Sequence, residues 1–299
     1  MKSMSSIKEK IDGLIEERAG WIFRRNIFCI TSKYLLLYLL NYKNTIKLAR
    51  EFEHRSADEI FSHMEDFVSK KVHVQGFENL PQSGAALIVC NHPTGIADGL
   101  IINKLVREKR QDSYFLANKD ILRVLPQLEE MIAPVEWRSD KRTRSDSRDT
   151  LKFIRKASNE NRIGIIFPSG RLAKRKGFVL KERPWMSSAA IIAKKYNLPV
   201  IPIHIKARNS FLFYLFDAIH PTLRDVTLFY ETLNKNQFRF RVRIGKPISP
   251  DRLDEDPQNA IDELMVAVAA LDPQNVNVPI GADNKTAGRK FGLAFSIDY

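Results

Sequence analysis

The stretch of sequence that decides the fold is Ala85-Ala86-Leu87-Ile88-Val89-Cys90, followed directly by Asn91-His92-Pro93-Thr94-Gly95-Ile96-Ala97-Asp98-Gly99. Its first part is a continuous apolar run, which is typical of a strand that is buried on both faces of a parallel sheet. The second part contains a histidine, an aspartate and the turn-forming residues proline and glycine. Ligands of open α/β sheets bind outside the carboxyl ends of the strands, so this stretch predicts a central strand with a polar site at its end.

Short apolar runs alternate with helical periods on both sides of this stretch. The alternation predicts an α/β fold with a mostly parallel or mixed central sheet, flanked by helices and preceded by an N-terminal helical segment. In the helix predicted at 146–157, we expect Leu151 and Ile154 to face the core. Residues 238–244 alternate apolar side chains with three arginines, which predicts a half-solvated strand. The other predicted strands are 72–74, 114–116, 132–135, 163–167 and 200–205. The other predicted helices are a pair within 47–69, a helical period at Leu100, Ile101 and Leu105, and the segments 184–196 and 257–271.

Composition along the chain predicts three parts: a helical, charged part at 1–70, a main domain at 71–272, and a polar tail at 273–299. The first part contains an aromatic and apolar stretch, Trp21–Tyr42, whose longest unbroken apolar run is Tyr34–Leu40. This run is too short to cross a membrane, because a spanning helix needs about 18 or more apolar residues. We therefore expect Trp21–Tyr42 to be either an interfacial helix or a helix that packs on the core.

The charge balance of the chain is strongly basic. Lys and Arg number 48 against 35 for Asp and Glu in 299 residues, so the net charge is +13. Such a charge favours a polyanionic partner, which is nucleic acid, an anionic membrane surface or an acidic carrier. Hydrophobic residues make up 44%, which excludes a disordered chain. The two cysteines, Cys29 and Cys90, are too few for a disulfide framework and indicate a reducing compartment.

The polar turn after the central strand carries the residues of a general base. A neutral imidazole with a carboxylate to orient it can deprotonate a hydroxyl, and His92 and Asp98 supply these groups. Their spacing corresponds to about 240° on a helix, so Pro93–Gly95 must form a turn that brings them together. The alternative is a capped turn with an incidental histidine. The other histidines show no metal-ligand spacing, so we expect no catalytic metal.

A second polar turn follows the strand predicted at 163–167. It reads Phe167-Pro168-Ser169-Gly170-Arg171 and opens a basic stretch that continues to Arg183. A glycine turn with an adjacent guanidinium is suited to hold a phosphate or a carboxylate. The alternative is a solvated basic loop.

Together and in this order, these segments resemble the lysophospholipid and glycerolipid acyltransferase superfamily, which contains the bacterial 1-acyl-glycerol-3-phosphate acyltransferases. The resemblance covers about residues 72–248. Asn91-His92 through Asp98 resembles the His/Asp box, Phe167–Arg171 resembles the Phe-Pro-x-Gly motif, and Val200-Ile201-Pro202 resembles the last proline-bearing block. Arg138 lies where an intermediate arginine-bearing block falls.

Two departures from the common motifs indicate a branch of this superfamily. The spacing between His92 and Asp98 is one residue longer than in the common box, and Ser169 stands where the Phe-Pro-Glu-Gly motif has its glutamate. With Arg208-Asn209-Ser210 and residues 240–247, these features are similar to the acyltransferases of ornithine-lipid synthesis and to proteins named hemolysins.

The resemblance implies an O-acyltransferase that moves a fatty acyl group from an acyl carrier protein or coenzyme A thioester to the hydroxyl of a lysolipid or glycerol-phosphate-type acceptor. It implies that His92 is the general base and that Asp98 orients it. The thioester carrier is a co-substrate, so no resident cofactor is expected. Backbone amides of the Pro93–Gly95 turn are candidate donors to the oxyanion. The residues implied for substrate binding are Asn91, Arg138, Ser169, Gly170 and Arg171.

The implied partners are an anionic membrane surface, acyl carrier protein or a coenzyme A thioester, and a lysolipid acceptor, whereas nucleic acid is not expected. The implied location is the cytoplasm, in peripheral contact with the cytoplasmic face of the inner membrane. Two other functions stay open. A non-catalytic basic protein that binds anionic lipid or nucleic acid explains the charge but leaves His92 and Asp98 without a role. A thioesterase-like hydrolase would use water in place of the acceptor hydroxyl.

Overall fold

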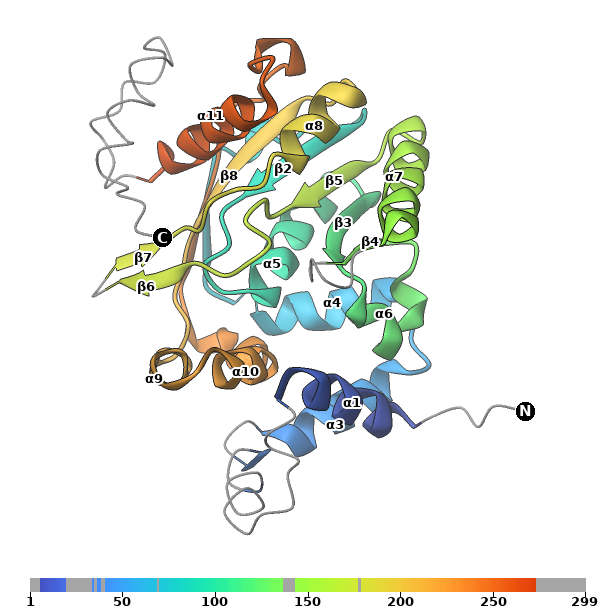
Figure 1. Cartoon of the computed structure of the whole chain (residues 1–299), viewed down its shortest axis with the longest axis vertical. Helices are drawn as coiled ribbons and strands as arrows, with labels where there is room; N and C mark the ends of the chain where they lie inside the picture. Colours follow the sequence, from blue (N-terminus) through green and yellow to red (C-terminus); the bar gives the residue numbers. More distant parts are fainter. Residues whose placement is uncertain are drawn as a thin grey trace.

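A seven-stranded sheet runs through the protein, with helices on both of its faces (Figure 1). The structure is a computed structural model, and it describes residues 6–19, 34, 37–38, 41–68, 70–136, 143–176 and 179–272. Within these residues, no helix is both long enough and apolar enough to cross a membrane.

The strand β2 (Ala86–Cys90) is the middle strand of the sheet, hydrogen-bonded to β8 on one side and β5 on the other. Ile88 lies opposite Ile201 of β8 and Ile165 of β5. β9 runs antiparallel to β8, whereas all the other neighbours are parallel, so the sheet is mixed. The α/β fold class predicted from the sequence is confirmed. In sheet order the strands are β1 (Val72–Gln75), β9 (Phe240–Ile244), β8 (Val200–Lys206), β2, β5 (Ile163–Ile166), β3 (Ser113–Asn118) and β4 (Ile132–Val135).

The two faces of β2 pack into two separate apolar clusters. Ala86, Ile88 and Cys90 belong to one cluster and Leu87 and Val89 to the other, because successive side chains of a strand point to opposite faces. All five are buried, as the continuous apolar run predicted.

Helices cover both clusters. The first face carries α1 (Ile7–Ala19), α3 (Tyr42–Phe52), α4 (Ala57–Val68), α5 (Ile96–Arg107) and α10 (Pro221–Leu233). The second face carries α7 (Arg144–Asn159), α8 (Ser188–Lys195) and α11 (Pro257–Ala269). Short elements connect these layers: α6 (Asp120–Val124) and the 3-10 turns Phe77–Asn79, Pro126–Leu128, Lys235–Gln237 and Pro250–Arg252.

Helix α7 confirms one of the two predicted core residues and corrects the other. The helix begins after Thr143, whose hydroxyl accepts a hydrogen bond from the Asp146 N–H at 3.1 Å. Ile154 is fully buried, as predicted, but Leu151 is 39% exposed. Three residues advance a helix by about 300°, which is about 60° short of a full turn. The side chains of residues 151, 154 and 157 therefore point in directions that differ by about 60° at each step. The prediction for Leu151 is wrong because Ile154 and Ala157 face the core, and Leu151 lies at the edge of that face.

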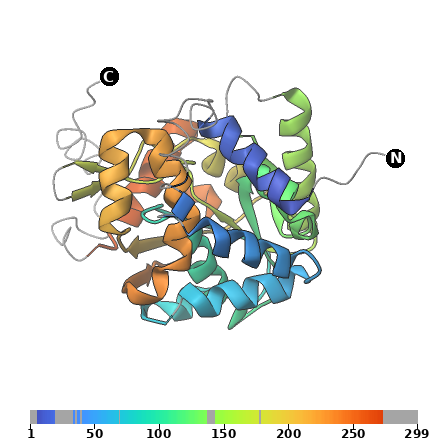
Figure 2. The ribbon, with the colours of Figure 1, turned by 90° about the horizontal axis from the view of Figure 1, so that it is seen from below.

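Three regions of the chain differ from the sequence-based expectations. α8 begins at Ser188, four residues later than predicted. The basic stretch after Arg171 forms an antiparallel hairpin, β6 (Lys174–Lys176) and β7 (Val179–Lys181), which has no apolar alternation that would reveal it. The sequence pattern predicts no element over residues 211–233, yet they form α9 (Phe211–Ile219) and α10, which pack side by side (Figure 2).

The N-terminal helices pack on the same core as the sheet. Ile7 of α1 and Ile46 of α3 are buried in the first apolar cluster. The helix pair predicted within 47–69 is confirmed by α3 and α4. Most of the Trp21–Tyr42 stretch and the tail at 273–299 lie outside the described residues, so the predictions for them stay predictions.

Candidate active site

The carboxyl ends of β2, β5 and β8 meet at one edge of the sheet, and Asn91 ties two of them together. Its side-chain oxygen accepts the Ile205 N–H at 2.7 Å, and its amide group donates to the Ile205 carbonyl at 2.9 Å. These two bonds extend the pairing of β2 with β8 beyond Cys90. The structure therefore gives Asn91 a place as a link between strand ends, and its role in substrate binding stays a prediction.

His92 and Asp98 face each other across the turn that follows β2. The imidazole Nδ1 lies 3.1 Å from Oδ2 of Asp98, whose side chain is fully buried, while the His92 side chain is 20% exposed. Gly95 makes this approach possible because its φ of 95° is in a region that side chains disfavour. α5 begins at the next residue. The turn expected at Pro93–Gly95 is thus present and brings the two side chains together.

The Asp98 carboxylate is held by donors from the same turn. Oδ2 accepts the backbone N–H groups of Thr94 and Gly95 at 2.8 and 2.9 Å, and Oδ1 accepts the Thr94 hydroxyl at 2.5 Å. Asp98 is the third residue of α5, so it also lies at the positive end of the helix dipole. These interactions fix the position of the carboxylate beside the imidazole.

The backbone amides of this turn are directed to carboxylates rather than to a substrate. Thr94 and Gly95 donate to Asp98, Pro93 has no N–H, and the His92 N–H donates to Glu182. The expectation that amides of the Pro93–Gly95 turn stabilise an oxyanion is therefore wrong.

Glu182, a carboxylate that the sequence analysis did not single out, lies beside His92. It directly follows β7, and its Oε2 accepts the His92 backbone N–H at 3.2 Å. Burial raises the pKa of the Glu182 carboxyl, while hydrogen bonds from the His92 N–H and the Ser169 side chain lower it. One signal could have found this residue: Glu182 is an acidic residue between Lys181 and Arg183 in a basic stretch.

The turn after β5 comes to the same place. Gly170 adopts a φ of 58° and donates its N–H to the Phe167 carbonyl at 2.9 Å, which closes the turn. Ser169 is buried, and its hydroxyl lies 2.7 Å from the Arg171 carbonyl oxygen. The Phe167 ring stacks on the His92 imidazole with ring centroids 4.2 Å apart, which fixes the plane of the imidazole.

Ser169 and Glu182 together account for the departure from the common Phe-Pro-Glu-Gly motif. Ser169 occupies the position of the motif's glutamate, and it lies close enough to Glu182 to lower the pKa of that carboxyl. A carboxylate is therefore still present beside the turn, but it comes from the end of the β6–β7 hairpin.

Arg171 is exposed at the edge of this turn. Ala173 donates its N–H to the His92 carbonyl at 3.0 Å, so the backbone after Arg171 is held against the His92 turn. Within the described part of the chain, the Arg171 guanidinium has no ion-pair partner. The structure thus brings together His92, Asp98, Ser169, Gly170 and Arg171, whereas Arg138 lies outside the described residues.

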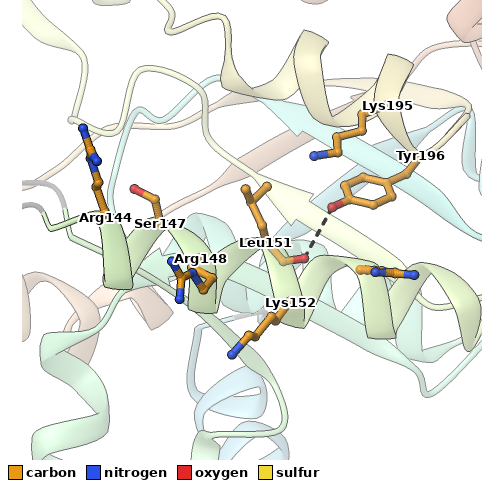
Figure 3. A pocket seen from close by; sticks show the side chains of 8 residues that line it. Arg144, Ser147, Arg148, Leu151, Lys152, Lys195 and Tyr196 are labelled. Atoms are coloured by element: carbon orange, nitrogen blue, oxygen red, sulfur yellow. Dashed lines mark hydrogen bonds between the residues drawn. The ribbon is translucent and has the colours of Figure 1, made fainter.

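A second feature, here called the α7–α8 groove, lies away from these residues and has a volume of about 600 Å³ (Figure 3). Its walls include Leu151 and Tyr196, whose hydroxyl donates to the Leu151 carbonyl at 3.4 Å. No carboxylate of the described residues lines it. The cations that line it, whose helical spacing the sequence analysis missed, are Arg144, Arg148, Lys152, Arg155 and Lys195.

Other reactive side chains of the described residues are not arranged for chemistry. No group of three or more His, Cys, Asp or Glu is placed to hold a metal ion in this part of the chain. Cys90 is fully buried in the core, and burial raises the pKa of its thiol well above the ordinary value. We therefore take the His92–Asp98 pair as the centre of the candidate site.

Comparisons with known proteins bear on this site. Residues 71–206 match the family model named Acyltransferase. The lyso-glycine lipid O-acyltransferase of Phocaeicola vulgatus is 30% identical over 190 residues, which cover 61% of this chain and 66% of that protein. The lyso-glycine lipid O-acyltransferase of Bacteroides thetaiotaomicron is 27% identical over 189 residues, which cover 61% of this chain and 68% of that protein. A solved structure, the 1-acyl-sn-glycerophosphate (LPA) acyltransferase PlsC of Thermotoga maritima, is 17% identical with a TM-score of 0.47, and the alignment covers 83% of this chain and 98% of that one.

The matched residues contain the candidate site. They include the strands from β1 to β8, the His92–Asp98 turn and the Phe167–Arg171 turn. The aligned stretch spans about two thirds of each of the two lyso-glycine lipid O-acyltransferases, 66% and 68%. Residues 71–206 thus carry the pattern of the Acyltransferase family, and this match supports the resemblance of the motifs to the glycerolipid acyltransferase superfamily.

Proposed function

We propose that the protein is an O-acyltransferase that moves a fatty acyl group from a thioester to the hydroxyl of a lysolipid. One observation carries the proposal: the His92 imidazole lies 3.1 Å from a fully buried Asp98 carboxylate, at the end of the central strand and inside the family match. A general base held by a carboxylate is the group that acyl transfer to a hydroxyl requires.

His92 and Asp98 divide the work of proton transfer. The Asp98 carboxylate lies 3.1 Å from Nδ1, and this proximity favours the imidazole tautomer that carries its proton on Nδ1. Nε2 is then the basic nitrogen that takes the proton of the acceptor hydroxyl. The hydroxyl oxygen bonds to the thioester carbonyl carbon, the C–S bond breaks, and the proton passes from Nε2 to the departing thiolate.

The acceptor that we propose is a lysolipid with an anionic headgroup. Two relatives are named lyso-glycine lipid O-acyltransferases, and this supports an acceptor of the lyso-aminolipid class ahead of lysophosphatidate or glycerol phosphate. Arg171, exposed beside the His92 turn, can pair with a carboxylate or a phosphate of such a headgroup. Gly170 and the buried Ser169 shape the turn that presents it.

The donor that we propose is a thioester on acyl carrier protein or coenzyme A, used as a co-substrate without a resident cofactor. Both carriers are anionic. The α7–α8 groove supports this proposal, because its five cations are not matched by a carboxylate in its lining. An acidic carrier docked there would place its negative charge against α7.

The site of action that we propose is the cytoplasmic face of the inner membrane, with the protein bound peripherally. The acceptor is amphipathic and resides in the bilayer, and the net charge of +13 favours an anionic surface. We propose no role for nucleic acid, because such a role would leave the His92–Asp98 pair without a function.

The test is acylation of a lysolipid panel by the purified full chain. The protein is incubated with labelled acyl carrier protein or labelled acyl-coenzyme A and each lysolipid, and products are read by mass spectrometry. We expect a new ester with wild-type protein and none with His92→Ala. Release of free fatty acid without ester formation would support the thioesterase-like hydrolase instead. Equal ester formation by wild type and His92→Ala would refute the mechanism.

A further inference from the structure

Helix α9 has an apolar face that nothing in the described part of the chain covers. Phe211, Leu215 and Ile219 are 76%, 42% and 61% exposed. They are spaced four residues apart, so they lie along one side of the helix. Phe213, on the opposite side, is 2% exposed and packs inward. A contiguous face of large apolar side chains in contact with water indicates a surface that binds a partner.

The helix is fixed in this orientation at both of its ends. Ser210 caps the N-terminus of α9, and its hydroxyl and N–H both bind the Glu231 carboxylate of α10. Glu231 pairs with Lys235 at 2.8 Å, and both side chains are fully buried. At the other end, Asp217 of α9 pairs with Arg224 of α10 at 3.1 Å. The apolar face cannot turn inward without breaking the hydrogen bonds of Ser210 to the buried Glu231 carboxylate and the Asp217–Arg224 ion pair.

Cations border the apolar face. The Arg175 guanidinium of β6 lies 5.3 Å from the centroid of the Tyr214 ring of α9. Arg208, close enough to act on Tyr214, is exposed. The acidic residue of α9, Asp217, is neutralised by its ion pair. An apolar face with a cationic rim is typical of a helix at the surface of an anionic bilayer.

The elements around this face also contact the catalytic turn. Leu228 of α10 lies 3.3 Å from the position that a Cβ atom on Gly95 would occupy. Ala173, which directly precedes β6, is hydrogen-bonded to the His92 carbonyl. α10 packs against both α9 and α5, and the chain at 173–175 links the His92 turn to Tyr214 of α9. The helices α9 and α10 lie next to each other in Figure 1.

We propose that the apolar face of α9, with the neighbouring cations Arg175 and Arg208, docks the protein on an anionic lipid bilayer beside the catalytic turn. This inference rests on the proposed function for the identity of the acceptor, whereas bilayer binding itself does not require turnover. It assigns docking to a helix that the sequence analysis did not recognise, in addition to the interfacial role considered for Trp21–Tyr42.

The first test is flotation of the full chain with vesicles of equal parts phosphatidylglycerol and phosphatidylcholine. The variant is Phe211→Ser/Ile219→Ser, and the matched control is Ile191→Ser on α8, where the isoleucine is 46% exposed. We expect the double variant to bind at least about tenfold more weakly, because two large apolar side chains no longer leave water. The control should float like wild type. Equal flotation of wild type and double variant would overturn the proposal.

The second test separates a local effect of charge from net charge. Arg175→Glu reverses a cation beside α9, and Arg148→Glu makes the same change in net charge in the α7–α8 groove. We expect Arg175→Glu to lose binding to the anionic vesicles severalfold and Arg148→Glu to lose much less. Equal losses would refute a docking site at α9, because binding would then follow net charge.

Two further measurements separate bilayer docking from catalysis and from self-association. The double variant should acylate a short-chain, water-soluble lysolipid at the wild-type rate and a vesicle-embedded lysolipid more slowly. A wild-type protein that floats through α9 but acylates neither acceptor would contradict the proposed function and leave the docking surface standing. A wild type that is dimeric in gel filtration, with a monomeric double variant and unchanged flotation, would show that α9 binds a second copy and would overturn the proposal.

Discussion

The two halves of the candidate site are built in different ways. The turn from Asn91 to Asp98 holds its own carboxylate, because Thr94 and Gly95 donate to Asp98 only a few residues along the chain. The second half, residues 167–183, depends on distant contacts. Glu182 meets the His92 N–H across 90 positions of the sequence. The reacting pair His92–Asp98 is therefore assembled by contacts within one turn, whereas the Glu182 carboxylate that supports it requires the β6–β7 hairpin to be in place.

Substitutions in the turn from Asn91 to Asp98 should have the largest effect on the chemical step. We expect His92→Ala to lower kcat by about 10³-fold or more, since the base is lost, while Tm stays near wild type because the side chain lies at the surface of the site. Asp98→Asn should lower kcat less, because the base remains. It should also lower Tm, since a neutral amide replaces a buried carboxylate that accepts three hydrogen bonds.

Steady-state acylation rates and thermal melts check this pair of effects. Asp98→Glu, which keeps the charge but lengthens the side chain, is the control. An Asp98→Asn protein with wild-type Tm and wild-type kcat would show that the turn does not depend on its carboxylate.

Residues 167–183 should affect catalysis by positioning the His92 imidazole, and substitutions of Glu182 test this most directly. We expect Glu182→Ala to lower kcat by about tenfold to 10²-fold, because the His92 backbone loses an acceptor and the imidazole shifts. Glu182→Gln keeps an oxygen that can accept the same N–H, so it should recover most of the rate. Rates with saturating acceptor measure the effect. If Glu182→Gln is as slow as Glu182→Ala, the charge rather than the hydrogen bond is required.

Arg171 should affect binding more than chemistry. We expect Arg171→Ala to raise the acceptor KM by about tenfold and to leave kcat nearly unchanged, if the guanidinium holds the headgroup equally in the ground and transition states. Arg171→Lys should restore part of the loss, because an ammonium cannot make a bidentate contact. The kinetics are measured in parallel with a phosphate-bearing and a carboxylate-bearing lysolipid. An unchanged acceptor KM for both would remove Arg171 from the acceptor site.

The smallest expected effect is a pH dependence of stability that comes from Glu182. Because burial raises the pKa of its carboxyl above the ordinary 4.5, the folded protein retains a proton that the unfolded chain releases. This contribution to the free energy of unfolding is fully present below pH 4.5 and is lost as the pH rises through the raised pKa of Glu182. The Glu182→Gln variant has no titrating carboxyl at this position, so it does not lose this stability as the pH rises. The difference in Tm, variant minus wild type, should therefore increase from about pH 4 to about pH 7. A difference that is constant over this range would contradict the assignment.

Features that depend on local periodicity were predictable from the sequence. The run Ala86–Cys90 is buried on both faces as its composition indicates, and the strands and helices that alternate around it occur in the predicted order. The turn at Pro93–Gly95 was predictable because the spacing of His92 and Asp98 excludes a regular helix between them. Leu151 was not, because a helix face is decided by what packs against it.

Features that depend on contacts between distant segments were decided by the tertiary structure. Glu182 in a basic stretch resembles a solvated side chain until the hairpin places it against His92, and Lys235 resembles a surface lysine until α10 buries it with Glu231. The same holds for α9, where a segment that is apolar on nearly every side does not reveal which side stays in water. The physical reason is that apolar alternation and turn chemistry act over a few residues, whereas burial and pairing of a charge depend on which segments the fold brings together.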